Sequence, residues 1–304
     1  MSRPPTTQPR RPTARQWLSA SRPRTLPAAI SPVLAGSALA VWASGFDLIT
    51  ALLALIVSVA LQIGVNLAND YSDGIRGTDA ERVGPVRLVG SGLAEPKAVR
   101  AAAFGCFGLA CVAGLVIVVI TAHWWLLAVG AACVLAAWFY TGGRHPYGYA
   151  GLGELFVFVF FGLVAVIGTV YVQVGGLPVS VWPTAVAIGL LSCGILVANN
   201  LRDIAGDRQA GKRTLATRLG DRGTRVLFLI MCLAAAAAVV AAALLSTWWA
   251  LLGLIMIVPA GAATRATLAG ATGHRLIGVL KQASLAELLC AVGLTAGMVL
   301  ATLI

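Results

Sequence analysis

The feature that most constrains this chain is a series of apolar runs, each close to the length that a helix needs to cross a lipid bilayer, about 20 residues. Only 11% of the 304 residues are charged, whereas soluble domains carry about 25%. The mean hydropathy is +0.89. We therefore predict an all-α integral membrane protein with nine transmembrane helices, at residues 25–44, 48–69, 98–120, 123–140, 152–173, 181–201, 225–245, 247–264 and 280–302.

The basic residues support this arrangement. All 22 Lys and Arg residues fall on one side of the membrane if the nine spans alternate in direction. That side is expected to be cytoplasmic, because Lys and Arg concentrate in cytoplasmic loops. An odd number of spans then places the N terminus inside and the C terminus outside, in the cell membrane. Because topology alone explains the net charge of +11, we expect no nucleic-acid partner.

The chain is expected to contain one folded domain. Residues 1–15 are rich in Pro, Thr and Arg and lack the apolar core of a signal peptide, so we predict a disordered basic cytoplasmic tail. Residues 16–304 are predicted to form a single polytopic domain. Around Trp17 and Leu18 a short amphipathic turn is expected at the inner surface. Six tryptophans are expected to anchor the outer interface: Trp42, Trp124, Trp125, Trp182, Trp248 and Trp249.

Two polar stretches interrupt the apolar chain at equivalent span ends. With Glu81, they hold six of the chain's 11 acidic residues. Residues three or four apart share a helix face, so each stretch should gather its carboxylates on one side of a helix end. The first contains Asn66, Asn69, Asp70, Asp73 and Asp79, and the second contains Asn199, Asn200, Asp203 and Asp207.

Carboxylates in these positions need a positive partner. Both predicted helices run from outside to inside, so each cluster lies at a helix C terminus, where the helix dipole is also negative. Mg²⁺ prefers oxygen ligands and commonly bridges carboxylates to phosphates. The pattern therefore predicts a site for Mg²⁺ and a phosphate-bearing substrate. The alternative is that the aspartates only pair with neighbouring arginines at the membrane boundary.

These residues resemble the motifs of the UbiA superfamily of membrane-embedded aromatic prenyltransferases. Asn69, Asp70 and Asp73 are similar to its first motif, and Asp203 and Asp207 to its second. The resemblance covers nearly all of residues 16–304. Five runs resemble the menaquinone branch, which prenylates 1,4-dihydroxy-2-naphthoate: 69–79 (NDYSDGIRGTD), 82–85 (RVGP), 140–143 (YTGG), 146–149 (PYGY) and 211–215 (GKRTL).

One position departs from the general superfamily pattern. The third acid of the first motif often follows the second by four residues, but Gly77 stands there and the acid is Asp79. The menaquinone branch shares this displacement. Asp79 is therefore a candidate substrate-binding residue whose role is less defined than those of Asp70 and Asp73.

The resemblance implies an architecture and a reaction. Nine helices would surround a central cavity that is open sideways to lipid and capped by cytoplasmic loops. A polyprenyl group would pass from polyprenyl diphosphate to 1,4-dihydroxy-2-naphthoate, with loss of CO₂, giving demethylmenaquinone. Asp70, Asp73, Asp203 and Asp207 would hold Mg²⁺ and stabilise the leaving diphosphate. Asn69 would bind substrate, and further charge would be neutralised by Arg76, Lys212 and Arg213.

Other candidate residues each have a structural alternative. Asn66 and Asn199 would orient the diphosphate or metal-bound water, or else join helices by hydrogen bonds. Arg22, with Arg24, would hold the acceptor's carboxylate, or else reflect topology alone. Glu154 would belong to the acceptor pocket or pair with Arg144. Tyrosines near the same loop would line the acceptor site or anchor the interface: Tyr140, Tyr147 and Tyr149.

Two other functions fit parts of the pattern. The same chemistry on another aromatic acceptor, such as 4-hydroxybenzoate, would use the same donor site. An ion-coupled transporter would also place acids on repeated helices, but these clusters lie at the inner surface and not at mid-membrane. The sequence specifies neither the length of the prenyl chain nor the oligomeric state, and it assigns no role to Glu287.

Overall fold

A computed structural model describes residues 12–77 and 87–304. In these residues the chain forms helices joined by turns and contains no strand, as predicted. The helical elements, labelled α for α-helices and η for 3₁₀- or π-helices, follow one another along the chain in this order: α1 (Ala14–Ala20), η1 (Pro23–Thr25), α2 (Pro27–Trp42), α3 (Leu48–Arg76), α4 (Pro96–Thr121), α5 (Leu126–Phe139), η2 (Tyr147–Ala150), α6 (Gly153–Val157), η3 (Phe158–Val164), α7 (Ala165–Val174), α8 (Val181–Gln209), α9 (Leu215–Leu244), η4 (Trp248–Met256), α10 (Ile257–Leu268) and α11 (His274–Leu303).

The predicted spans can be compared with these helices one by one. Each predicted span coincides with a helix or with two or three joined helical segments. By length and composition, the described residues contain seven helices that can cross a membrane, or eight if α1–η1 and α2, bent by 52°, are one span. The apolar helix α5 is shorter. The chain is therefore a multi-pass membrane protein, although these criteria do not establish nine crossings.

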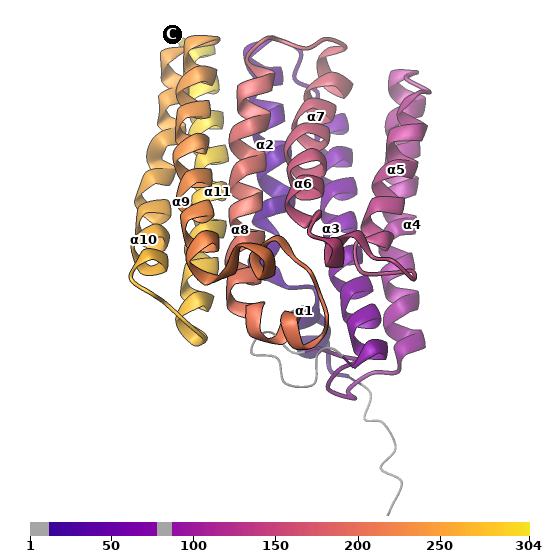
Figure 1. Cartoon of the computed structure of the whole chain (residues 1–304). Helices are drawn as coiled ribbons and strands as arrows, with labels where there is room; N and C mark the ends of the chain where they lie inside the picture. Colours follow the sequence, from indigo (N-terminus) through magenta and orange to yellow (C-terminus); the bar gives the residue numbers. More distant parts are fainter. Residues whose placement is uncertain (1–11, 78–86) are drawn as a thin grey trace, which may run out of the picture.

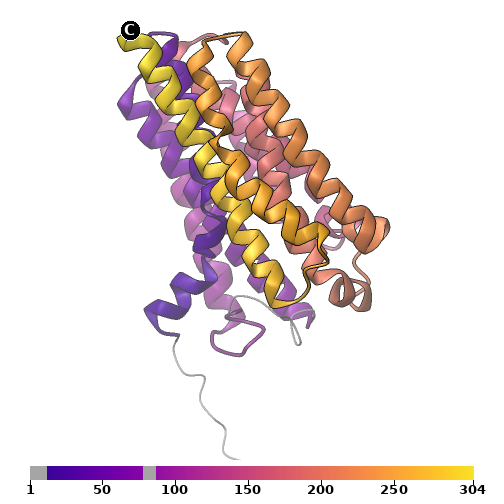
Figure 2. The ribbon, with the colours of Figure 1, turned by 90° about the vertical axis from the view of Figure 1, so that its left-hand side faces the viewer.

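The helices stand roughly side by side, as Figure 1 shows. Helices α9, α10 and α11 lie on one side of the bundle, α3, α4 and α5 on the other, and α2 and α8 between them. Figure 2 shows the same bundle from the side of α9 to α11, with α1 at the end opposite the C terminus. Helix α8 is central: 72% of its apolar window is buried, more than in any other crossing helix.

Helix α3 carries the first polar stretch inside the helix itself. Asp47 caps its start by accepting a hydrogen bond from the Thr50 amide at 2.7 Å. The helix continues past residue 69, the expected end of the span, to Arg76, because no proline intervenes. Gly77 then ends it in the left-handed region, with φ of 69°. The carboxylates of Asp70 and Asp73 are therefore held on the last turns of this helix.

The fifth predicted span is continuous but irregular. α6, the π-helix η3 and α7 together form one crossing segment, Gly153–Val174. Gly162 in η3 lies against α8, where a Cβ would stand 2.6 Å from the Cα of Gly189. Helix α9 also contains a break, because Gly220 has φ of 70°. Its second part coincides with the predicted span at 225–245.

The N-terminal helix lies where a short amphipathic segment was expected. α1 begins at Ala14, inside the segment 1–15 that we predicted to be a disordered tail. Thr13 and Gln16 form a reciprocal capping box at its start. Trp17 packs against a buried cluster around Leu67, whereas Leu18 is exposed. The helical part therefore begins slightly earlier than predicted, and residues 1–11 lie outside the described part of the chain.

The tryptophans predicted at the outer interface lie at or next to the helix ends opposite the polar stretches. Five of them are well exposed: Trp124, Trp125, Trp182, Trp248 and Trp249. Exposed indole rings at one end of an apolar bundle fit a membrane–water boundary.

Helix α11 and η4 approach each other closely through glycines. A Cβ on Gly297 would lie 2.1 Å from the carbonyl oxygen of Trp249, and one on Gly293 would lie 2.3 Å from that of Leu252. The two glycines are one helical turn apart and face the same backbone. Small residues at this spacing allow membrane helices to pack at short range.

We expect Gly297→Ala to destabilise the fold. The new methyl group would collide with the η4 backbone, and overpacking of this kind costs about 1–3 kcal/mol. Thermal unfolding of the purified protein in detergent measures the effect. Gly278→Ala is the matched control, because Gly278 lies on the same helix and a Cβ added there would meet no atom of another segment within 4 Å. Equal melting temperatures for the two variants would contradict the close packing.

Candidate active site

The two polar stretches come together at one end of the bundle. The first lies on the last turns of α3, and the second lies on the last turns of α8. Both are at the end of the bundle opposite the C terminus (Figure 1). Within the first stretch, Asn66, Asn69, Asp70 and Asp73 are all buried, with at most 7% of each residue exposed. Asp79, which we predicted to bind the substrate, lies outside the residues that the structure describes.

Asp70 fastens the segment before α4 to the end of α3. Its two carboxylate oxygens accept hydrogen bonds from the backbone amides of Leu88 at 2.7 Å and Val89 at 3.0 Å. Hydrogen bonds between backbone amides and a carboxylate are shorter and stronger than those between neutral groups. Only 1% of Asp70 is exposed.

Cationic side chains from two segments lie close to the carboxylate of Asp73. The Arg87 guanidinium lies 3.5 Å from Oδ2, and the Lys212 ammonium lies 3.3 Å from Oδ1. The same ammonium lies 3.8 Å from Oδ1 of Asp207. Lys212 therefore joins the first stretch, on α3, to the second, on α8.

Tyr149 lies beside this junction. Its hydroxyl donates a hydrogen bond to Oδ1 of Asp73. Lys212 Nζ lies 4.5 Å from the centre of its ring, and the Arg76 guanidinium lies 5.4 Å from it. Burial raises the pKa of the Tyr149 hydroxyl, and the negative charge of Asp73 raises it further, against an opposing effect of Arg76. The hydroxyl therefore stays protonated and able to donate.

Arg76 and Arg213, both predicted to bind the substrate, differ in position. The Arg76 guanidinium donates to the carbonyl oxygens of Thr141 and Gly143, which holds the segment after α5 against α3. Arg213 is exposed, and its described contact with the site is through the backbone, where its amide donates to the Tyr149 carbonyl at 2.8 Å.

Asp203 has a cation next to it in the chain. The Arg202 guanidinium donates to both of its carboxylate oxygens, at 2.7 and 2.9 Å. Pairing of aspartates with neighbouring cations was the structural alternative to a metal site. It applies to Asp203 and, through Lys212 and Arg87, to Asp73.

Within residues 12–77 and 87–304, no three acidic, His or Cys side chains gather as ligands of one metal ion. The donor chemistry still fits a hard cation, because carboxylate oxygens are the ligands that Mg²⁺ prefers. The Lys212 ammonium already lies within 4 Å of carboxylates from both stretches. A positive charge is thus accommodated between Asp73 and Asp207.

Asn66 and Asn69 connect α3 to the segments around it. The Asn66 amide donates to the Ser21 carbonyl at 3.0 Å and to the Thr25 hydroxyl at 3.2 Å. Asn69 Oδ1 accepts a hydrogen bond from the Thr141 hydroxyl at 2.6 Å. These bonds match the structural role that we considered for Asn66, and both side chains also line the cavity described next.

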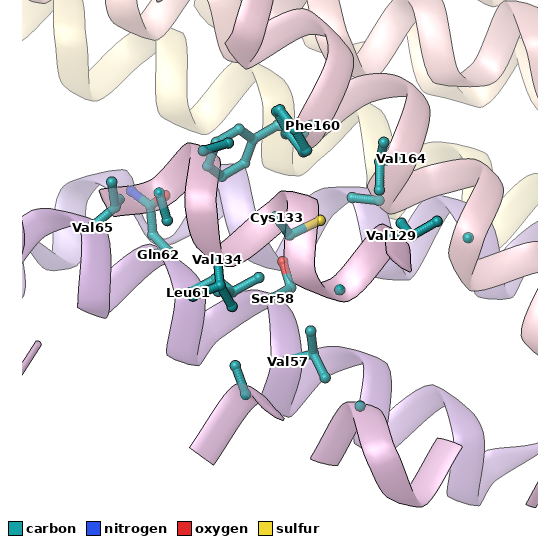
Figure 3. Close-up of a pocket in the computed structure, with 18 of the residues that line it drawn as sticks. Val57, Ser58, Leu61, Gln62, Val65, Val129, Cys133, Val134, Phe160 and Val164 are labelled. Carbon is teal, nitrogen blue, oxygen red and sulfur yellow. The ribbon is translucent and has the colours of Figure 1, made fainter. Parts of the chain in front are cut away.

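A cavity of about 520 Å³ opens beneath these residues. Most of its wall is apolar and comes from α3, α4, α5, η3 and α7; Figure 3 shows Val57, Leu61 and Val134 among the side chains around this space. Its polar lining includes five residues that we predicted to bind substrate: Arg22, Asn66, Asn69, Tyr140 and Asn199. An apolar chamber with polar groups from the carboxylate stretches can hold an amphipathic substrate.

Aromatic rings form a row along this cavity. Tyr140 meets Tyr147 edge to face, with ring centres 5.5 Å apart. Tyr147 stacks on Phe156 at 3.9 Å, and Phe156 stacks on Phe160 at 6.0 Å. All four residues line the cavity. Of the three tyrosines considered for the acceptor site, Tyr140 and Tyr147 therefore line the cavity, whereas Tyr149 lies with the charged groups.

Glu154 has a different described partner from the one we considered. It is buried, and its Oε1 accepts a hydrogen bond from the Asn200 amide at 2.9 Å. Arg144 is exposed and has no described contact with Glu154. Glu287, to which the sequence assigned no role, is fully buried and accepts a hydrogen bond from Ser192 at 2.6 Å.

Sequence comparison identifies close relatives of known description. The UbiA prenyltransferase family model matches residues 29–274. A 1,4-dihydroxy-2-naphthoate octaprenyltransferase of Mycobacterium tuberculosis is 52% identical over 283 residues, which cover 93% of this chain and 96% of the relative. A protein of the same description from Escherichia coli is 42% identical over 215 residues, covering 69% and 70%.

Solved structures share the fold at low sequence identity. The apo structure of a UbiA homologue from Aeropyrum pernix has a TM-score of 0.68 and 18% identity, covering 90% of this chain and 98% of that chain. A UbiA homologue from Archaeoglobus fulgidus, bound to GPP and Mg²⁺, has a TM-score of 0.61 and 11% identity, covering 92% and 99%. The helical bundle is therefore common to these proteins.

We expect Asn200→Leu to lower stability, because it removes the described donor to the buried Glu154 carboxyl group. Loss of a partner for a buried polar group costs about 1–3 kcal/mol. The shift in melting temperature of the purified protein measures the cost. Asn199→Leu is the matched control, since the described residues give the Asn199 side chain no hydrogen bond. A larger loss of stability in Asn199→Leu would contradict the assignment.

Proposed function

We infer the function from the premise that this chain belongs to the UbiA prenyltransferase family and is a membrane-embedded prenyltransferase. We propose that it transfers a polyprenyl group from polyprenyl diphosphate to 1,4-dihydroxy-2-naphthoate. The ring carboxylate leaves as CO₂ and the product is demethylmenaquinone. The observation that carries the proposal is the apolar cavity whose polar lining adjoins two carboxylate stretches joined through Lys212.

The acceptor is proposed from the relatives. The Mycobacterium tuberculosis protein, described as a 1,4-dihydroxy-2-naphthoate octaprenyltransferase, matches 93% of this chain at 52% identity. Relatives of the same description from several bacteria favour a naphthoate over 4-hydroxybenzoate as acceptor. Family membership also favours the transferase over the ion-coupled transporter.

The charged residues would handle the donor's diphosphate. Asp70, Asp73, Asp203 and Asp207 would hold Mg²⁺, which acts as a Lewis acid on the leaving diphosphate. Lys212 and Arg76 would offset the remaining negative charge, because both already lie at the same cluster. UbiA homologue structures bound to Mg²⁺ with DMAPP or GPP support this assignment.

The cavity would protect the allylic group once its bond to the diphosphate breaks. Its apolar wall holds the prenyl chain and excludes water, which would otherwise trap the positive charge. The aromatic rings of Tyr140, Tyr147 and Phe156 line this path, and aromatic rings attract cations. The chain's aromatic row would therefore guide the prenyl group toward the acceptor.

Arg22 and Tyr140 would position the acceptor. Both line the cavity. Arg22 has φ of 54°, an uncommon conformation for a residue other than glycine, and the bond from Asn66 to Ser21 holds the adjacent turn. The turn that carries Arg22 is thus held in place, and a guanidinium group suits a carboxylate such as that of the naphthoate.

We expect Asp70→Asn and Asp203→Asn to reduce kcat/KM by about a hundredfold or more, since each removes a charge that would stabilise the leaving group. Purified protein is given labelled polyprenyl diphosphate, Mg²⁺ and either 1,4-dihydroxy-2-naphthoate or 4-hydroxybenzoate, and prenylated product is measured. Glu95→Gln, an exposed acid next to the start of α4, is the control and should keep wild-type activity.

Two outcomes would count against this function. If the wild-type protein makes no prenylated, decarboxylated naphthoate, the proposed reaction is wrong. Near-normal turnover in folded Asp70→Asn and Asp203→Asn would mean that the carboxylate stretches are structural.

We also propose that the carboxylate stretches face the cytoplasm, because the Lys and Arg residues gather on their side. Alkaline phosphatase fused after Ile304 should be active in cells, and green fluorescent protein fused there should be dark. The same reporters fused after Gly270, in the loop between α10 and α11, should give the opposite result. Identical signals at both positions would contradict this orientation.

A further inference from the structure

We propose that Tyr149 is a positioning residue for the donor's diphosphate, acting through the two cations that its ring holds. The proposal rests on the function above, because it takes Lys212 and Arg76 as the groups that meet the diphosphate. Tyr149 itself would touch neither the reacting carbon nor the acceptor. Its role would be to keep the flexible side chain of Lys212 aimed at one place, beside the Arg76 guanidinium, before the donor arrives.

The contacts of Tyr149 link its own segment to two others in the chain. Its hydroxyl donates to Asp73 on α3. Its carbonyl accepts a hydrogen bond from the Arg213 amide at 2.8 Å, after α8. It belongs to η2, between α5 and α6. One residue therefore connects three of the segments that lie near the carboxylates: α3, η2 and the turn after α8.

The ring is shared by two positive groups from different segments. Lys212 Nζ lies 4.5 Å and the Arg76 guanidinium 5.4 Å from its centre. Both distances are within about 6 Å, where the face of an aromatic ring attracts a cation. The ring attraction, together with the charge of Asp73, therefore opposes the repulsion between the two cations.

The backbone around Lys212 is fixed as well. Its amide donates to the Asp207 carbonyl at 2.8 Å, and the next amide, that of Arg213, donates to Tyr149. The side chain of Lys212 therefore starts from a defined turn and ends at Tyr149 and Asp73. A lysine side chain is otherwise a flexible four-carbon stem, and ordering it in advance reduces the entropy lost when an anion binds.

This arrangement predicts that the electron density of the ring, more than its hydroxyl, sets affinity for diphosphate. Tyr149→Phe keeps the ring and should leave the KM for polyprenyl diphosphate within about threefold of wild type. Phenylalanine analogues with increasing fluorination at position 149 keep the shape but withdraw charge from the ring face. Across that series the donor KM should rise by about tenfold.

Two further readouts separate this role from a structural one. The inhibition constant of inorganic pyrophosphate should rise in parallel with the donor KM, because pyrophosphate carries only the head of the donor. The KM for 1,4-dihydroxy-2-naphthoate should stay constant. Thermal unfolding of each protein identifies any variant whose fold is altered.

A double-substitution cycle tests whether Tyr149 acts through Lys212. Lys212→Met alone should raise the donor KM, and Tyr149→Leu alone should do the same. In the Lys212→Met background, Tyr149→Leu should add much less than it does in the wild-type background. Strictly additive effects would exclude action through Lys212.

The outcomes distinguish this proposal from the proposed reaction. A wild-type enzyme that prenylates the naphthoate, but whose donor KM and pyrophosphate inhibition constant stay flat across the fluorinated series, would overturn the role of Tyr149 alone. A parallel rise in the acceptor KM would also overturn it, because the ring would then act on the whole site. A wild-type enzyme without transferase activity would instead refute the reaction itself.

Discussion

Neutralising carboxylate charge at the membrane boundary is the constraint on which the rest of this structure depends. Asp70 and Asp73 are almost fully buried near the end of α3, where the helix dipole adds to their negative charge. Backbone amides of Leu88 and Val89 offset the first, and Lys212, Arg87 and Tyr149 surround the second. The same partners draw the segments after α3, α5 and α8 together into one cap.

The cavity lies next to this cap, and specific residues set the spacing of the helices around it. Gly162 and Gly189 let η3 lie directly on α8, and the π-helical turns of η3 present Phe160 and Val164 beside the cavity. The α9 to α11 side is packed tightly around α11 and η4. The space for a substrate therefore lies on the α3 to α7 side, under the charged groups.

Several parts of this architecture could be predicted from the chain alone, because they follow from local rules. The length of each apolar run gives the helices, and the spacing of Asn66, Asp70 and Asp73 places them on one helix face. The exact extent of α3 could not be derived from hydropathy, since a helix that leaves the membrane remains a helix until a residue such as Gly77 ends it. Residue pairs between distant segments, such as Glu154 with Asn200, leave no signal in spacing.

The sequence by itself determined the membrane class, the chemical character of the two polar stretches and the resemblance to aromatic prenyltransferases. Composition, periodicity and local motifs carry this information, because burial in lipid and helix geometry act over a few turns. Only the tertiary structure decided that Lys212 lies between Asp73 and Asp207, and that Tyr149 belongs with the charged groups while Tyr140 faces the cavity. The contacts of Asp73 with Tyr149 and Lys212 join residues more than 60 positions apart in the chain. Tertiary packing sets the distance and direction of such contacts, because no local sequence rule acts over that separation.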